Sequence, residues 1–121
     1  MRIDGLPKPD PKLQSLFNSL QPAICGIVVA EVLHGARDAA DYGKLAMALA
    51  PFPQVAMHDS IWEVVGRNLW GLRSRGVSVP FQDVAIAIVA MENDFELWTR
   101  ATQFQLIQTV FPQLKLFQEP P

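Results

Sequence analysis

Cysteine, charge and long apolar runs are all scarce in this sequence, and each shortage excludes a class of protein. The one cysteine, Cys25, cannot form a disulfide within the chain, and its apolar neighbours favour a buried thiol in a reducing compartment. Charged residues make up 18% of the chain and sum to −2, so no global field attracts nucleic acid. No apolar run reaches the roughly 18 residues of a transmembrane helix, and the polar N-terminus does not resemble a signal peptide. We therefore expect a cytoplasmic protein without a membrane partner.

The pattern along the chain predicts an α/β fold. With 121 residues, half of them hydrophobic, the chain is long enough for one domain with a core, and we expect a single domain over residues 1–121. Short apolar segments alternate with helical ones, which predicts right-handed crossovers and a three-layer α/β/α arrangement around a central parallel sheet. The predicted strands are 22–27, 54–57, 95–99 and 114–117, and the predicted helices are 11–20, 28–35, 37–50, 60–76, 80–93 and 103–110.

The helix predicted over 60–76 carries the most complete set of helix signals. Ser60 and Glu63 match the S-x-x-E capping box, in which two side chains satisfy free backbone N–H groups at the start of a helix. Arg73 and Arg75 suit the negative end of the helix dipole, and Gly76 suits the position just after the end.

Two acids follow predicted strands or begin predicted helices, which places them at the edge of a parallel sheet where ligands bind. Glu31 lies four residues beyond 22–27 among valines, and Asp83 lies in the first turn after Pro80. Each acid has an ordinary structural interpretation. Asp83 can be a helix N-terminal acid, with a contribution of about 0.3–1 kcal/mol, and Glu31 can pair with Arg37 or another cation.

Considered together, the two acids predict a metal site. Two carboxylates at one end of a parallel sheet repel each other unless a positive charge lies between them. Mg²⁺ is commonly held by one or two carboxylates, with water and substrate phosphate as the other ligands. This arrangement suits hydrolysis of phosphodiesters, because the ion activates water and neutralises charge developing on the phosphate.

Three segments of the chain stand out together: "CGIVVAEVLHGA", "LWGLRSRGVSVPFQDVAIAIVAMENDFELWTRATQF" and "FPQLKLF". In their order and spacing, over nearly the whole chain, they resemble the PIN domain, in the small bacterial form that serves as the VapC toxin of toxin–antitoxin pairs. The resemblance implies a ribonuclease dependent on Mg²⁺ or Mn²⁺, with Glu31 and Asp83 in the positions of the second and third site acids. It also implies an RNA substrate, a homodimer and a VapB-like antitoxin that blocks the site.

The sequence departs from the family at the two other site acids. The family begins with a central strand that ends in an Asp-Thr or Asp-Ser motif, and here Ile3 and Asp4 align with the end of that motif, so this strand and its acid are missing. Ala101 and Gln103 occupy the usual positions of the fourth acid. Three explanations are a start codon assigned too far downstream, unusual pairing by the N-terminal segment, and a decaying gene. We expect a truncated or divergent member.

Among the remaining polar and aromatic residues, Arg100 is the best candidate for a contact with substrate phosphate, because it follows the predicted strand 95–99 directly. We expect surface or capping roles for His34 and His58, and core or dimer packing for Trp62, Trp70 and Trp98. Two hypotheses follow. The chain is a metal-dependent endoribonuclease, or it is a non-catalytic PIN-like module that keeps the fold for dimerisation or antitoxin binding.

Overall fold

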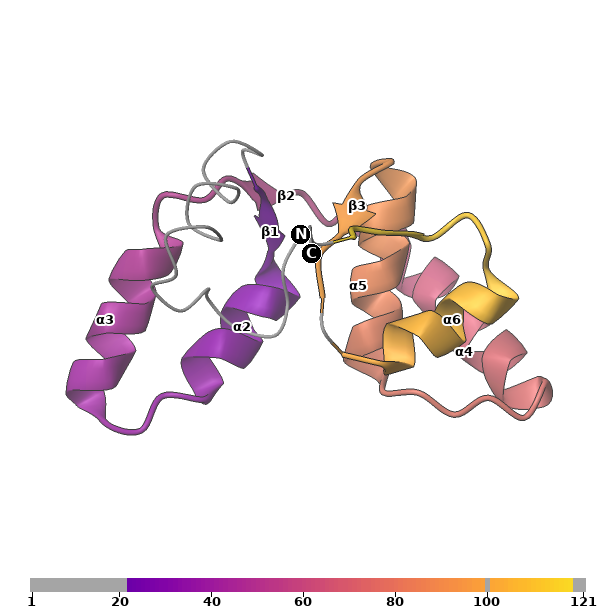
Figure 1. Ribbon diagram of the computed structural model, residues 1–121, viewed down its shortest axis with the longest axis horizontal. Helices are drawn as coiled ribbons and strands as arrows, with labels where there is room; N and C mark the ends of the chain where they lie inside the picture. Colours follow the sequence, from indigo (N-terminus) through magenta and orange to yellow (C-terminus); the bar gives the residue numbers. More distant parts are fainter. Residues whose placement is uncertain (1–21, 100, 119–121) are drawn as a thin grey trace.

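The computed structural model describes residues 22–99 and 101–118, which fold as a mixture of five helices and four short strands (Figure 1). The predicted helix 11–20, the segment aligned with the missing first strand, and Arg100 lie outside the described residues. In chain order the elements are β1 (Ile24–Cys25), α2 (Gly26–His34), α3 (Ala39–Leu49), β2 (Gln54–Val55), α4 (Ile61–Ser74), α5 (Phe81–Glu92), β3 (Glu96–Leu97), α6 (Gln103–Val110) and β4 (Lys115–Leu116). Each predicted helix and strand within the described ranges is present, although every strand is shorter than predicted.

The strands form two separate parallel pairs. β1 pairs with β2, with Ile24 opposite Gln54, and β3 pairs with β4, with Leu97 opposite Leu116. Parallel neighbours require a long crossover, which α2 and α3 provide for the first pair and α6 for the second. Between 22 and 118, the described residues do not join the two pairs into the one central sheet that the sequence predicted.

Helix α5 forms the centre of the core. Its residues 83–90 are all buried, and α2, α4, α6 and β3 all pack against it. A helix that is hydrophobic on every side must be enclosed by other elements, which explains the unbroken apolar run "VAIAIVA". Figure 1 shows α5 with α4 and α6 on one side of the molecule and β1, β2, α2 and α3 on the other. Helix α5 also contacts α2, so it packs against elements of both sides.

The predicted end of the long helix is confirmed, whereas its predicted capping box is not formed. Gly76 has a φ of 79°, its N–H donates to Arg73 O, and Val77 N donates to Leu72 O at 2.9 Å. These two bonds are the Schellman pattern, in which a left-handed residue satisfies the last helical carbonyls. At the other end, Ser60 has helical dihedral angles, and its side chain makes no capping hydrogen bond. The Ser60 hydroxyl is in the wrong place to cap because the chain already turns helically at this residue.

The tryptophans divide between core and surface. Trp98 is buried, as predicted for a core residue, but Trp62 and Trp70 on α4 are 46% and 63% exposed. The core alternative of the prediction therefore does not apply to Trp62 and Trp70, and dimer packing stays a prediction for them. Trp62 stacks against the exposed Phe81, with ring centroids 6.3 Å apart. The described helices include none that is long and apolar enough to cross a membrane.

Candidate functional site

The first turn of α5 places Asp83 in the interior of the protein. Pro80 precedes the helix with a φ of −60°, and the backbone N–H of Asp83 donates to the Pro80 carbonyl at 3.1 Å. The residue is only 5% exposed and is the one buried charged residue among the described ones. Its Oδ2 accepts a hydrogen bond of 2.8 Å from Nε2 of Gln103, the first residue of α6. Asp83 is therefore far more enclosed than an ordinary acid at a helix N-terminus.

Glu31 reaches the same region from α2. The residue is half-buried, and its Oε1 is buried without any hydrogen-bond partner. A buried oxygen with no partner costs free energy, commonly about 1–3 kcal/mol, so such atoms are rare in folded proteins. Of all the buried side-chain oxygens and nitrogens in the described part of the chain, Glu31 Oε1 is the one left unpaired.

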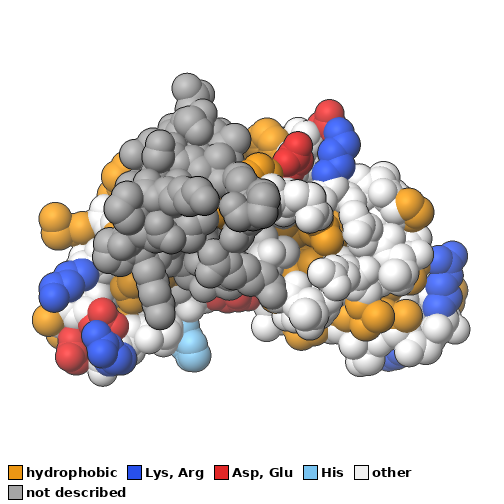
Figure 2. Space-filling view, viewed as in Figure 1, with side chains coloured by type: hydrophobic (Ala, Val, Ile, Leu, Met, Phe, Trp, Pro, Cys, Tyr) orange, Lys and Arg blue, Asp and Glu red, His pale blue; other side chains and the backbone are white. Residues whose placement is uncertain are grey.

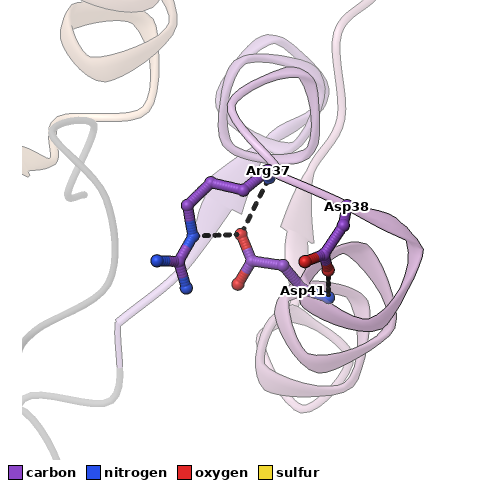
Figure 3. A network of polar contacts seen from close by, with 3 residues as sticks. All are labelled: Arg37, Asp38 and Asp41. Carbon is purple, nitrogen blue, oxygen red and sulfur yellow. Dashed lines mark hydrogen bonds and ion pairs between the residues drawn. The ribbon is translucent and has the colours of Figure 1, made fainter.

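Arg37, which the sequence suggested as a partner for Glu31, pairs with Asp41 instead. The side chain of Arg37 lies 3.5 Å from Asp41 through its Nε, and its backbone N–H donates to the same Oδ2 at 3.0 Å (Figure 3). Asp38 caps α3 by accepting a hydrogen bond of 2.7 Å from Asp41 N. Arg37 and Asp41 thus stabilise the start of α3, and the expected ion pair with Glu31 is not formed.

Glu31 and Asp83 are close enough to interact electrostatically. The pKa of Glu31 lies above its ordinary value, first because burial penalises the charged carboxylate and second because the negative charge of Asp83 repels it. In the described ranges the ion pairs are Arg37 with Asp41, Arg67 with Glu63, and Lys115 with Asp94. Neither acid of the pair is therefore neutralised by a described lysine or arginine.

The donor set partly fits a divalent cation. Two carboxylates that repel each other, one with an unpartnered buried oxygen, provide the negative charge and free lone pairs that Mg²⁺ or Mn²⁺ requires. The set is small, because residues 22–99 and 101–118 contain no group of three or more His, Cys, Asp and Glu side chains suited to a metal. His34 and His58 are both exposed, as predicted. Cys25 is buried, and burial raises the pKa of its thiol, so it does not offer a thiolate.

Gln103 is the partner of Asp83 that the sequence did not reveal. In the sequence it was noted only as a neutral residue in an acid's position. One signal in the sequence could have identified Gln103, namely its place beside the apolar residues Phe104 and Ile107. The structure buries both of these side chains fully. A polar amide on the first turn of such a helix needs a buried partner.

Outside this region, the described side chains on the face drawn in Figure 2 form no continuous patch of lysine and arginine. The lysine and arginine side chains of the described residues lie in small groups near the edges of this face, several beside acids. A pocket of about 330 Å³ lies at the end of α4 and is lined by Trp70, Arg73 and Val79, among others. None of the residues that line this pocket is acidic, so neither Glu31 nor Asp83 is among them.

No family model matches the sequence, and no curated protein is similar to it at the level of sequence. Solved structures do match. A chain of VapBC-5 of Mycobacterium tuberculosis, from the VapBC family of toxin–antitoxin systems, is 17% identical with a TM-score of 0.65, over 80% of this chain and 81% of that one. A chain of VapBC2 of Rickettsia felis, which was solved bound to promoter DNA, is 21% identical with a TM-score of 0.71, over 93% and 87%. A chain of FitAcB of Neisseria gonorrhoeae is 15% identical with a TM-score of 0.62, over 93% and 88%. The chain therefore has a VapC-like fold.

Proposed function

We propose that this chain is a metal-dependent endoribonuclease of the VapC type, the toxin component of a toxin–antitoxin pair. The observation that carries the proposal is the buried, unpartnered Oε1 of Glu31 next to the buried carboxylate of Asp83. A VapC-like fold that leaves two such acids without a described cation is stabilised when a metal ion lies between them.

In this proposal the residues of the chain have distinct roles. Glu31 and Asp83 hold Mg²⁺ or Mn²⁺, and Arg100, which lies outside the described residues, contacts the phosphate of the RNA. The ion would supply positive charge against the scissile phosphodiester and would activate the attacking water. The enclosed position of Asp83 strengthens these electrostatic interactions, because little solvent reaches that carboxylate to screen them.

The test is cleavage of single-stranded RNA by the purified protein with Mn²⁺, comparing wild type with Asp83→Asn and Glu31→Gln. Each substitution keeps the shape of the side chain and removes its charge, so we expect a loss of at least about 100-fold in rate, equivalent to about 2.7 kcal/mol or more of transition-state stabilisation. Asp59→Asn makes the same chemical change at an exposed acid and should cleave like wild type. Equal rates for Asp83→Asn and Asp59→Asn would contradict the proposal.

Two protein partners belong to the same proposal, a VapB-like antitoxin and a second copy of the chain. The exposed aromatic residues Trp62, Trp70 and Phe81 on neighbouring helices support a protein contact, because aromatic side chains are enriched in interfaces. We expect light scattering to show a dimer, and Trp70→Glu to reduce dimerisation if this face is the contact. A monomer at high micromolar concentration would remove the homodimer from the proposal.

The second candidate function is a non-catalytic module that keeps the VapC-like fold for binding. It is favoured by the small donor set, since among residues 22–99 and 101–118 only two acids meet, and more would be needed for a strong metal site. Binding of an antitoxin, together with no RNA cleavage by wild type in Mn²⁺ and no effect of Mn²⁺ on thermal stability, would favour this second function.

A further inference from the structure

Gln103 is the residue through which helix α6 reaches the acid pair. It is half-buried, and its Nε2 lies 2.8 Å from Asp83 Oδ2, a contact that joins residues 20 positions apart in the sequence. Figure 1 shows the first turns of α5 and α6 side by side at the same end of the molecule. The contact is a charge-assisted hydrogen bond, which is stronger and more directional than a bond between neutral groups.

This bond engages one oxygen of the acid pair, while another oxygen of the pair is left without a partner. Gln103 Nε2 donates to Asp83 Oδ2, and Glu31 Oε1 is buried without a hydrogen bond. The amide of Gln103 therefore restrains the Asp83 carboxylate through one of its two oxygens. It also adds no charge, so the site keeps two negative charges.

We propose that Gln103 is a positioning residue that orients Asp83 toward Glu31 for a divalent cation, and that its neutral amide limits the affinity of the site for that cation. This inference rests on the proposed metal site. Partners that orient a ligand from outside the coordination sphere commonly change metal affinity about 10-fold to 100-fold when they are removed. A carboxylate at the same position would add a third negative oxygen within reach of the pair.

The experiment measures Mn²⁺ binding in the absence of RNA, by the loss of the free-ion signal in electron paramagnetic resonance. Four single variants are compared with wild type: Gln103→Ala, Gln103→Glu, Gln105→Glu and Asp83→Asn. Gln105 lies on the same helix but is exposed, so Gln105→Glu is a matched control for the added charge. Melting temperatures with and without Mn²⁺ provide a second readout, because an ion that binds the folded state stabilises it.

We expect Gln103→Ala to weaken Mn²⁺ binding about 10-fold and Gln103→Glu to strengthen it by about the same factor. Gln105→Glu should leave it unchanged. Without metal, Gln103→Glu should melt below wild type, because three carboxylates then repel one another, and Mn²⁺ should raise its melting temperature more than that of wild type. Gln103→Ala tests the positioning role, because it removes the hydrogen bond to Asp83 without adding charge, and Gln103→Glu tests the limit that the neutral amide sets on affinity.

The outcomes separate the two proposals. If Asp83→Asn weakens Mn²⁺ binding measurably while Gln103→Ala binds like wild type, the metal site stands and the role of Gln103 is overturned. If Asp83→Asn binds Mn²⁺ as well as wild type, the metal site itself is wrong. If wild type binds below detection and Gln103→Glu binds measurably, the inference is supported. If no variant binds, Gln103→Glu included, both proposals are overturned.

The variant Asp83→Asn with Gln103→Ala tests whether Gln103 acts through Asp83. When two residues form one unit, removing the second costs nothing further once the first is gone. We therefore expect the double variant and Asp83→Asn to bind Mn²⁺ equally. An additional loss in the double variant would show that Gln103 contacts the ion directly and would overturn the positioning role.

Discussion

The two helices that carry the acids differ sharply in how they are packed. On α5 the eight residues 83–90 are all buried, whereas on α2 Val28 alone is buried and the remaining residues are half-buried or exposed. Asp83 has a hydrogen-bond partner in Gln103, and Glu31 Oε1 has none. The candidate site therefore joins one carboxylate held by the core to one held by a helix near the surface.

This difference has a physical consequence for ligand binding. A carboxylate fixed by packing and by a hydrogen bond loses little conformational entropy when it binds an ion, because its rotamer is already set. A carboxylate on a lightly packed helix can adapt its position to the ion and the substrate.

The largest effect is expected from a cavity in α5. Ile86 is fully buried, so Ile86→Ala should lower the free energy of unfolding by about 2–5 kcal/mol. Leu33 on α2 is half-buried against the same core, and Leu33→Ala should cost about 1 kcal/mol because less apolar area is lost. Urea unfolding followed by circular dichroism measures both. Equal losses would show that α2 is as tightly packed as α5.

The sequence contained enough information to predict α5 and its neighbours. Local signals such as Pro80 before α5 and Gly76 after α4 depend on the residue itself, and they gave helix boundaries within a few residues. The single central sheet depended on pairing between segments that are far apart in the sequence, and the described strands form only two pairs. The exposure of Trp62 and Trp70 could not be predicted, because hydrophobicity does not show which helix face another element covers.

The second largest loss of stability is expected at Gly76, which ends α4, and Gly35, which ends α2, is its comparison. Gly76 has a φ of 79°, where a Cβ costs about 1–2 kcal/mol, so Gly76→Ala should destabilise the protein by about that amount. Gly35 has a φ of −78°, and a Cβ there would lie 3.5 Å from Val32 O, which is an ordinary contact. Gly35→Ala should therefore be neutral or stabilising by up to about 1 kcal/mol. Equal destabilisation would contradict the left-handed end assigned to α4.

The candidate site was predictable in part. The proximity of Glu31 and Asp83 could be predicted from the sequence, because Glu31 lies just beyond a predicted strand and Asp83 lies in the first turn of a helix after Pro80. The contact between Gln103 and Asp83 could not, since it depends on the angle at which α6 meets α5. The pairing of Arg37 with Asp41 was also missed, although the two residues are four positions apart at the start of α3.

The smallest effect concerns the charge of Glu31 and changes with pH. The pKa of Glu31 in the folded protein is raised, by burial first and by Asp83 second, so the unfolded carboxyl ionises at a lower pH than the folded one. As the pH rises between these two pKa values, the folded state binds more protons than the unfolded state and stability falls. Below about 4.3, the ordinary pKa of glutamate, the penalty disappears, and above the folded pKa it is complete.

Glu31→Gln should therefore raise the melting temperature at pH 7 in metal-free buffer, and the gain should vanish at low pH, where wild type is neutral as well. Glu92→Gln, at an exposed acid, should show no such dependence. With Mn²⁺ the sign should reverse, because an ion between Glu31 and Asp83 turns their repulsion into two attractions that the Gln variant cannot complete. If Glu31→Gln is more stable than wild type both with and without Mn²⁺, the carboxylate of Glu31 does not bind the cation.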